Sequence, residues 1–423
     1  MGSLLADRVL PLIRTRGELW GRAAATAHGR QMHEAVAILY GAAEREDPAV
    51  VFTVTQRAIG SAITIILRAD DSNGVIGDAI DGLLALHPRL AAKASVPPAR
   101  LVEWMIRFQF DGRQDFFNLD PVAYAPALGA AGTDLYRSRL AEIYNQLGPE
   151  RADDQYAPRL RVEDPAAWDH VIEERRTRFV LDYNAQRLAV LDRDVDAIIA
   201  THAPDRTVAS RLHDTAKALA EIGETDPAID WAREATNIDH GHQARQAARY
   251  WCDLITEHHP DQLCDTCLVV FNRWPTAETA NDLRQAARDA WPRHKDHVTQ
   301  TLAAQPREAV RFTLDYLREP ARAWELAHQL GLADNHTWET LADAYAQIDP
   351  AAVLPVLGRL VDLDLQVADA RNYRSAAHRL QQMRALSAAT PDDAGVDQLI
   401  ADLRHRNRHR PRLQREFDAA NLP

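Results

Sequence analysis

The sequence predicts an all-α protein in which a helical-hairpin, tetratricopeptide-like solenoid follows an irregular N-terminal helical lobe. Ala, Leu, Arg, Asp and Glu dominate the 423 residues and glycines number only 18. β-Branched residues rarely alternate with polar ones, which favours helices over strands. Asp-Pro pairs predict where several helices begin, and prolines that recur about every thirty residues predict that helices follow one another in pairs.

An aspartate followed by a proline is a helix-start signal. The carboxylate accepts hydrogen bonds from the first free N–H groups of the helix, and proline has no N–H that would be left unpaired there. We therefore expect helices to begin at these pairs. The chain contains Asp47-Pro48, Asp120-Pro121, Asp164-Pro165, Asp226-Pro227 and Asp349-Pro350.

Residues 1–150 are expected to form the N-terminal lobe. Apolar residues at helical spacing between 48 and 69, and again from Leu101 to Phe108, predict two helices that each bury one stripe. An aromatic cluster nearby could line a ligand site, but aromatic side chains at helical spacing usually fill a core. We interpret it as the core of this lobe. The cluster consists of Trp104, Phe108, Phe110, Phe116 and Phe117.

The segment 148–164 separates this lobe from the rest of the chain. It contains prolines, acidic residues and two arginines around Leu160, without apolar periodicity. Such a segment predicts a boundary between the lobe and a repeat region at 165–423, which ends in a basic helix. A long loop within one continuous array is the alternative.

Within the repeat region, five prolines each open a helix-like segment. A spacing near thirty residues is typical of one helix pair per repeat. The prolines are Pro227, Pro260, Pro292, Pro320 and Pro350. They predict the pairs 227–239 with 243–258, 260–273 with 276–291, 292–304 with 307–317 and 320–331 with 336–348, and a last pair that starts at 350.

The formal net charge of −12 argues against a general nucleic-acid coat, because such proteins usually present a basic surface to phosphates. The final helix-like segment is an exception, and its guanidinium groups could bind phosphates or an acidic partner. Alternatively, the segment is a solvated or self-docked capping helix, since a spacing of two scatters charges around a helix. Its arginines are Arg404, Arg406, Arg408, Arg410, Arg412 and Arg415.

The three cysteines are too few for a disulfide framework. Cys252, Cys264 and Cys267, with His258 and His259 between them, could supply zinc ligands. However, the last two cysteines lie inside an apolar stretch that reads as a helix, where free cysteines usually pack as small hydrophobic residues. We favour packing and expect no metal.

An acidic turn at 70–81 is the other candidate for a metal. Asp70, Asp71 and Asp78 could hold a cation, but Val75 and the absence of a following glutamate break the calcium-loop pattern. Asn73-Gly74 within it is ordinary turn chemistry. We favour a capped turn and keep a metal-dependent activity here as a third hypothesis.

No familiar catalytic motif occurs in the sequence. There is no Gly-x-Ser-x-Gly elbow, no His-Glu-x-x-His, no phosphate-binding glycine-rich loop and no dinucleotide fingerprint, so we expect a non-enzymatic protein with no cofactor. An acid and a base follow the first six residues, which excludes an apolar signal core there. The apolar stretch 50–67 carries Gln56 and Arg57, so no membrane span is expected. A cytoplasmic location follows.

Three short motifs carry a resemblance. They are Asp-Asp-Ser-Asn-Gly-Val-Ile-Gly-Asp at 70–78, Gly-Thr-Asp-Leu-Tyr-Arg-Ser-Arg-Leu at 132–140 and Asn-Tyr-Arg-Ser-Ala-Ala at 372–377. With them, the chain from about residue 30 to 418 resembles an uncharacterised bacterial all-helical family that also occurs as the C-terminal half of SWIM zinc-finger proteins. The chain lacks the Cys-x-Cys and Cys-x-His of that finger. The resemblance therefore implies a helical-repeat body that acts with a separate partner.

Three functions remain open. The first is an interaction scaffold that binds a protein or peptide on the concave face of the hairpins at 227–389, since repeat surfaces bind by extended complementarity. The second is a nucleic-acid-associated accessory protein that uses the basic segment 404–415. The third is the metal-dependent activity at 70–81. The sequence leaves the oligomeric state open.

Overall fold

The computed structural model describes residues 2–111, 114, 117–147, 165–388 and 393–423. The described residues are almost entirely helical, with a single isolated bridge between Leu19 and Ala69 and no strand, so the all-α prediction is confirmed. Contacts within the chain define two units, Met1–Ala235 (unit 1) and Thr236–Pro423 (unit 2). Each unit is described by itself.

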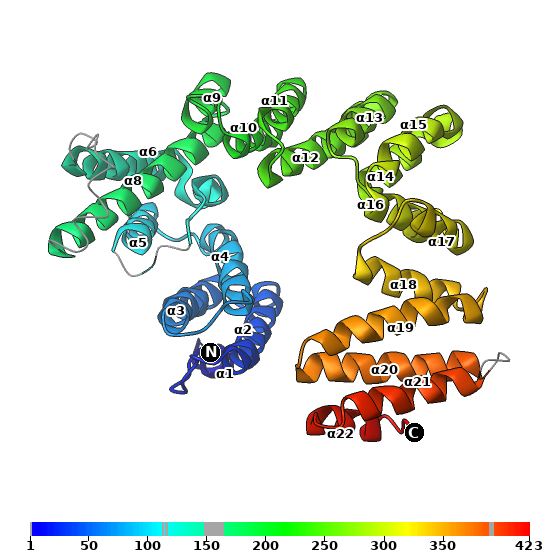
Figure 1. The fold of residues 1–423 in the computed structure, drawn as a ribbon. Helices are drawn as coiled ribbons and strands as arrows, with labels where there is room; N and C mark the ends of the chain where they lie inside the picture. Colours follow the sequence, from blue (N-terminus) through cyan, green and yellow to red (C-terminus); the bar gives the residue numbers. More distant parts are fainter. Residues whose placement is uncertain (1, 112–113, 115–116, 148–164, 389–392) are drawn as a thin grey trace. The chain divides into compact units, whose positions relative to one another are not determined.

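Unit 1 begins with four helices, α1 to α4, that pack on one another, and continues with the helices from α5 to α11 (Figure 1). The helices are α1 (Gly2–Ile13), α2 (Arg22–Ala43), α3 (Pro48–Ile66), α4 (Val75–Lys93), α5 (Pro98–Phe110), α6 (Pro121–Leu147), α8 (Pro165–Asp192), α9 (Val195–His202), α10 (Ala209–Glu221) and most of α11 (Thr225–Ile238).

Two of the predicted Asp-Pro starts in unit 1 have the expected cap. The Asp47 carboxylate accepts a hydrogen bond of 3.0 Å from the N–H of Ala49. Asp120 does the same for Val122 at 3.0 Å. Helices α3 and α6 accordingly begin at the prolines, whereas α11 begins at Thr225, two residues before Pro227.

Helix α3 supplies much of the core of unit 1. Val51, Ala58 and Ile65 lie on its buried stripe, as the sequence predicts. Among the described helices, α3 is the one whose length and composition would let it cross a membrane, and half of that stretch is buried inside the unit. Its opposite face is partly exposed and carries Arg57.

A closed ring of buried hydrogen bonds joins α5, α6 and α8. Gln109 donates to Tyr136 Oη at 2.7 Å, Tyr136 donates to Asn184 Oδ1 at 2.7 Å, and Asn184 donates to Gln109 Oε1 at 3.2 Å. Burial also raises the pKa of Tyr136 above its usual range. Because breaking the ring would leave buried polar atoms without partners, it fixes how these helices pack.

The predicted boundary segment 148–164 lies outside the described residues, but the helices on its two sides belong together. Arg187 of α8 donates to both carboxylate oxygens of Asp120, each at 2.9 Å, and to both oxygens of Glu221, each at 2.7 Å. These contacts and the buried ring tie α8 to α5 and α6. Contacts within the chain place the division between the two units between Ala235 and Thr236.

Unit 2 is a series of short helices, each of which packs mainly on the next along the chain. After the end of α11 they are α12 (His242–His258), η2 (Pro260–Gln262), α13 (Leu263–Arg273), α14 (Ala277–Ala287), η3 (Arg288–Ala290), α15 (Trp291–Ala303), α16 (Pro306–Arg311), η4 (Phe312–Tyr316), α17 (Pro320–Gln329), α18 (Asn335–Tyr345), α19 (Pro350–Gln366), α20 (Ala370–Ser387), α21 (Asp393–Arg406) and α22 (Pro411–Ala419).

The prolines of unit 2 stand where the sequence predicts. Pro260, Pro320 and Pro350 are the first residues of η2, α17 and α19, and Pro292 is the second residue of α15. The predicted helix pairs match these helices within a few residues. One departure is η4, a π-helical turn in which the N–H of Leu317 donates to Phe312 O; this wider turn is not visible in apolar periodicity.

Candidate functional site

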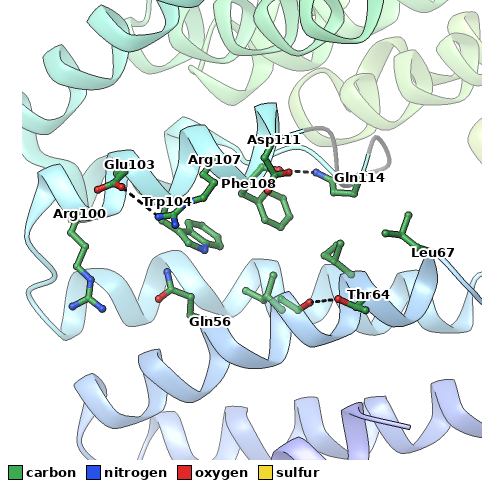
Figure 2. Close-up of a pocket in the computed structure, with 13 residues that line it drawn as sticks. Gln56, Thr64, Leu67, Arg100, Glu103, Trp104, Arg107, Phe108, Asp111 and Gln114 are labelled. Carbon is green, nitrogen blue, oxygen red and sulfur yellow. Dashed lines mark hydrogen bonds and ion pairs between the residues drawn. The ribbon is translucent and has the colours of Figure 1, made fainter. Parts of the chain in front are cut away.

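Helices α3 and α5 of unit 1 face each other across an open groove of about 570 Å³ (Figure 2). Residues three, four and seven apart share one face of a helix. On α5 this spacing aligns Arg100, Trp104 and Phe108, and on α3 it aligns Gly60 with Leu67. Each helix thus turns its other face to the core and this one to the groove.

The floor of the groove is apolar. Ile59 and Ile63 are buried beneath it, while Trp104 and Phe108 are half-buried and face α3. Leu67 is 51% exposed at one end. An apolar floor that stays open to water, in reach of a few polar groups, is typical of a binding site.

Gly60 keeps the middle of the groove open. A Cβ built at this position would meet no atom within 4 Å. Glycine inside a helix costs about 0.5–1 kcal/mol relative to alanine, and φ at Gly60 is helical, so the backbone does not require it. A side chain at this position would therefore extend into the open groove without a backbone clash.

The rim of the groove is charged. Arg107 forms an ion pair with Glu103, with 3.7 Å between Nη2 and Oε1. Arg100 lies at the end near Gln56, and Asp111 lies at the other end (Figure 2). The two ends of the groove thus differ in charge, with Arg100 at one end and Asp111 at the other.

Trp104 is supported from behind by a buried histidine. The ring of His87 on α4 lies 4.2 Å from that of Trp104 and 4.7 Å from that of Phe52, measured between centroids. Its Nδ1 is 2.9 Å from Tyr124 Oη, while Nε2 has no hydrogen-bond partner in the described part of the chain. Burial lowers the pKa of His87 to about 3, so the ring is neutral at pH 7 and packs as an aromatic group.

The interpretation of the aromatic cluster as core is correct for Phe117, which is buried, whereas Trp104 and Phe108 pack against the core on one side and line the groove on the other. Phe110 is half-buried, and Phe116 lies outside the described residues. The sequence did hold a signal. Arg100 and Arg107 lie four residues before and three after Trp104, so they share its helix face. Charged residues on that face indicate that it is partly exposed to solvent.

The acidic turn at 70–81 caps α4. Asp71 accepts hydrogen bonds from the N–H of Ile76 through Oδ1 and of Gly77 through Oδ2, each at 2.8 Å. Partial burial and the nearby Asp78 raise the pKa of Asp81. Both oxygens of Asp71 are therefore used by the helix start, which is the capped turn that the sequence favours.

The cysteines lie in unit 2, on α12 and α13. Cys264 Sγ is 3.6 Å from His294 Nε2. A hydrogen bond with Cys267, together with burial, raises the pKa of Cys252. Throughout the described ranges, no group of three or more His, Cys, Asp or Glu side chains could hold a metal ion.

A second hollow, of about 770 Å³, lies beside these cysteines between α12, α13 and α14. Two of its three arginines are engaged by one carboxylate, and the third, Arg288, lines the hollow together with Asp253, Asp261 and Asp282. Arg249 Nη2 is 2.8 Å from each oxygen of Glu278, and Arg245 lies 3.7 Å from the same group. Because these charges largely compensate each other, the α3–α5 groove is the better candidate for a partner site.

The six C-terminal arginines do not share one helix. The chain turns at 407–410, so they are divided between α21, this turn and α22. The sequence predicted one helix-like segment, and this was wrong because the residue before a proline is disfavoured in the α conformation. Arg410 precedes Pro411 and has φ −108° and ψ 80°.

Two of the six arginines are used inside unit 2. Arg404 pairs with Asp418 at 2.9 Å and donates to Pro423 O at 2.7 Å, and Arg410 donates to Leu365 O at 2.9 Å. The other four are exposed: Arg406, Arg408, Arg412 and Arg415. Arg404 and Arg410 are thus bound within unit 2, whereas the other four point to solvent. The spacing of the arginines in the sequence does not reveal this difference.

Comparison with known proteins places the chain in a family. Residues 13–404 match the model of a family described as being of unknown function, DUF6880. No curated protein matches the chain. The match covers nearly the whole sequence and agrees with the resemblance to an uncharacterised family. The chain therefore belongs to the DUF6880 family of unknown function.

Proposed function

We propose that this protein is a non-enzymatic interaction scaffold that binds a segment of a partner protein in the α3–α5 groove. The observation that carries this proposal is the open apolar floor, with Leu67 half exposed between charged rims. Exposed apolar surface of this kind is stabilised when a partner covers it. The proposed surface thus lies in unit 1 and not on the hairpins at 227–389.

The dimensions of the groove suit a short amphipathic helix. From Arg100 to Asp111 the face of α5 extends over roughly 16 Å, at about 1.5 Å per residue. About three turns of a partner helix span this length. Such a helix would insert apolar residues at i, i+3 or i+4, and i+7 between Trp104 and Leu67. The resemblance to a body that acts beside a separate partner supports the same function.

Peptide display tests this proposal. Phage-displayed 16-residue peptides are selected on the full-length protein, and the binders are measured against Gly60→Trp, which fills the groove. Ala85→Trp, at an exposed position of α4 outside the groove, is the matched control. We expect Gly60→Trp to weaken binding at least tenfold while Ala85→Trp leaves it unchanged, with both variants folded by circular dichroism.

Two outcomes would overturn the proposal. One is a set of binders that tolerate Gly60→Trp as well as Ala85→Trp, or a selection that yields no binder. The other is concentration-dependent dimerisation in sedimentation experiments that Gly60→Trp abolishes, since the groove would then bind a second copy of this chain.

A second candidate function, nucleic-acid binding, is favoured by the four exposed arginines Arg406, Arg408, Arg412 and Arg415. Contacts of arginine with phosphate release counterions, so binding should fall steeply as salt rises. We expect replacement of all four by glutamine to remove retention on immobilised duplex DNA or RNA at 50 mM salt. Absence of retention by the unaltered protein, or retention that survives the replacement, rules this candidate out.

A further inference from the structure

Next to the groove, unit 1 has a smaller hollow of about 470 Å³ whose charged side chains are all arginines. It lies where the chain leaves α1 and where α3 ends. Its lining consists of Arg14, Thr15, Arg16, Ser61, Thr64, Ile65 and Arg68, without an aspartate or glutamate. A basic hollow of this kind stands out in a chain with a net charge of −12.

The fold holds two of these arginines in place. Arg14 Nε donates to Ser61 Oγ at 3.0 Å. Arg68 donates to the carbonyl oxygens of Thr15 and, at 3.2 Å, of Gly17, and thereby fastens the loop after α1 to the end of α3. The partners of Arg14 and Arg68 are thus neutral groups, which orient the guanidinium groups without cancelling their charge.

The positive charge of the hollow is only partly offset. In the described ranges of the chain, none of Arg14, Arg16 and Arg68 forms an ion pair with a carboxylate. The C-terminal ends of α1 and α3 also lie here, and each contributes about half a negative charge. The three guanidinium groups therefore outweigh the roughly one unit of negative charge from the two helix ends.

The hollow and the groove are neighbours around α3, because Thr64 lines both. Gly60 and Ile63 face the groove, whereas Ser61 and Ile65 face the hollow, about a third of the way round the helix. A segment that leaves the groove beside Thr64 therefore passes from the apolar floor to the arginines. Both surfaces can contact one ligand.

We propose that the partner segment is acidic as well as amphipathic, with its apolar face in the groove and its aspartate or glutamate side chains paired with Arg14, Arg16 and Arg68. This inference rests on the proposed function and names the chemistry of the partner. Arginine binds carboxylates through two parallel hydrogen bonds. Because Arg14 and Arg16 are exposed, they can turn to a ligand without disturbing the core.

The test uses the peptides selected on the full-length protein. We expect these peptides to be enriched in aspartate and glutamate beside their apolar positions. Arg14→Gln with Arg16→Gln should weaken their Kd by about 3- to 30-fold at 50 mM salt, and by less at 300 mM, as for pairs near a surface. Arg68 is left intact because it holds the loop.

The matched control is Arg22→Gln with Arg30→Gln, which removes the same charge from two exposed positions of α2 outside both hollows. We expect it to change the Kd by less than twofold. Equal losses in both double variants, no loss in either, or peptides without acidic enrichment would overturn the inference. Peptides that respond to Gly60→Trp but not to Arg14→Gln with Arg16→Gln refute the inference alone, whereas peptides indifferent to Gly60→Trp refute the proposed function itself.

Discussion

The two units differ in how far along the chain their polar contacts reach. In unit 1, Asn184 and Gln109 are 75 residues apart, and Arg187 and Asp120 are 67 apart. In unit 2, comparable contacts join nearby helices, such as that between Arg249 of α12 and Glu278 of α14, which are 29 apart. The polar contacts of unit 1 therefore reach farther along the chain than those of unit 2, where Arg410 and Leu365 are 45 residues apart.

This difference predicts two kinds of stability. An array in which each helix packs on its neighbours loses structure locally, because its stability is a sum of adjacent interfaces. A unit closed by long-range buried bonds loses structure as a whole. The groove, which needs α3 and α5 at a fixed separation, lies in the second kind of unit.

The largest effect should come from breaking the buried ring of unit 1. Asn184→Leu leaves Tyr136 Oη and Gln109 Oε1 with fewer partners, at a cost of about 3 kcal/mol. We expect hydrogen–deuterium exchange to rise together across α5, α6 and α8. Gln382→Leu removes an amide hydrogen bond of 2.6 Å to Asp343 at the surface of unit 2 and should cost less than about 0.5 kcal/mol. Equal effects would contradict the contrast between the units.

The next effect is a pH dependence of unit 1. His87 has a pKa of about 3 when folded and near 6.5 when unfolded, so the unfolded state binds the proton more readily. Stability should be constant above pH 6.5 and fall by about 1.4 kcal/mol per pH unit between pH 6 and 3. From pH 7 to pH 5 the unaltered protein should lose about 2 kcal/mol more than His87→Phe in denaturant titrations. Parallel curves for the two proteins would show that His87 is not the source.

A smaller and local effect is expected in unit 2. Asp334 caps α18 by accepting hydrogen bonds from Thr337 Oγ1 at 2.5 Å and Thr337 N–H at 2.8 Å, which lower the pKa of Asp334. Asp334→Ala should cost about 1 kcal/mol, with faster exchange confined to α17–α19. Asp296→Ala, at an exposed position inside α15, serves as the control. Loss of protection throughout unit 2 would show that its helices do not respond locally.

The smallest effect separates two glycines of unit 1. Gly60→Ala should stabilise the protein by about 0.5–1 kcal/mol, because the helix gains alanine and the new Cβ meets open space. Gly129 interrupts α6 with φ +58° and ψ −177°, a conformation nearly reserved for glycine. Gly129→Ala should therefore destabilise. If the unfolding temperature falls for both variants, the new Cβ at position 60 does not lie in open space.

Local signals in the sequence predicted much of the fold. Asp47-Pro48, Asp120-Pro121 and Asp349-Pro350 begin helices because cap and proline act within one turn of the chain. The same logic predicted a capped turn before α4, and the structure identifies Asp71 as the acceptor. It failed at Arg410, where the proline that ends the basic helix was overlooked.

The candidate site could not be predicted in the same way. Trp104 and Phe108 have the spacing of core residues, and only the position of α3 opposite them leaves their faces open. Likewise, Arg14 and Arg68 are far apart in the sequence and line one hollow because α1 and α3 end close together.

The sequence by itself determined that this protein is helical and where most helices begin, because capping and periodicity depend on residues within one or two turns. The tertiary structure decided which helices form a unit, which aromatic face stays open and which arginines remain uncompensated. These properties depend on contacts between residues such as Gln109 and Asn184, whose partners are chosen by packing in space and not by distance along the chain.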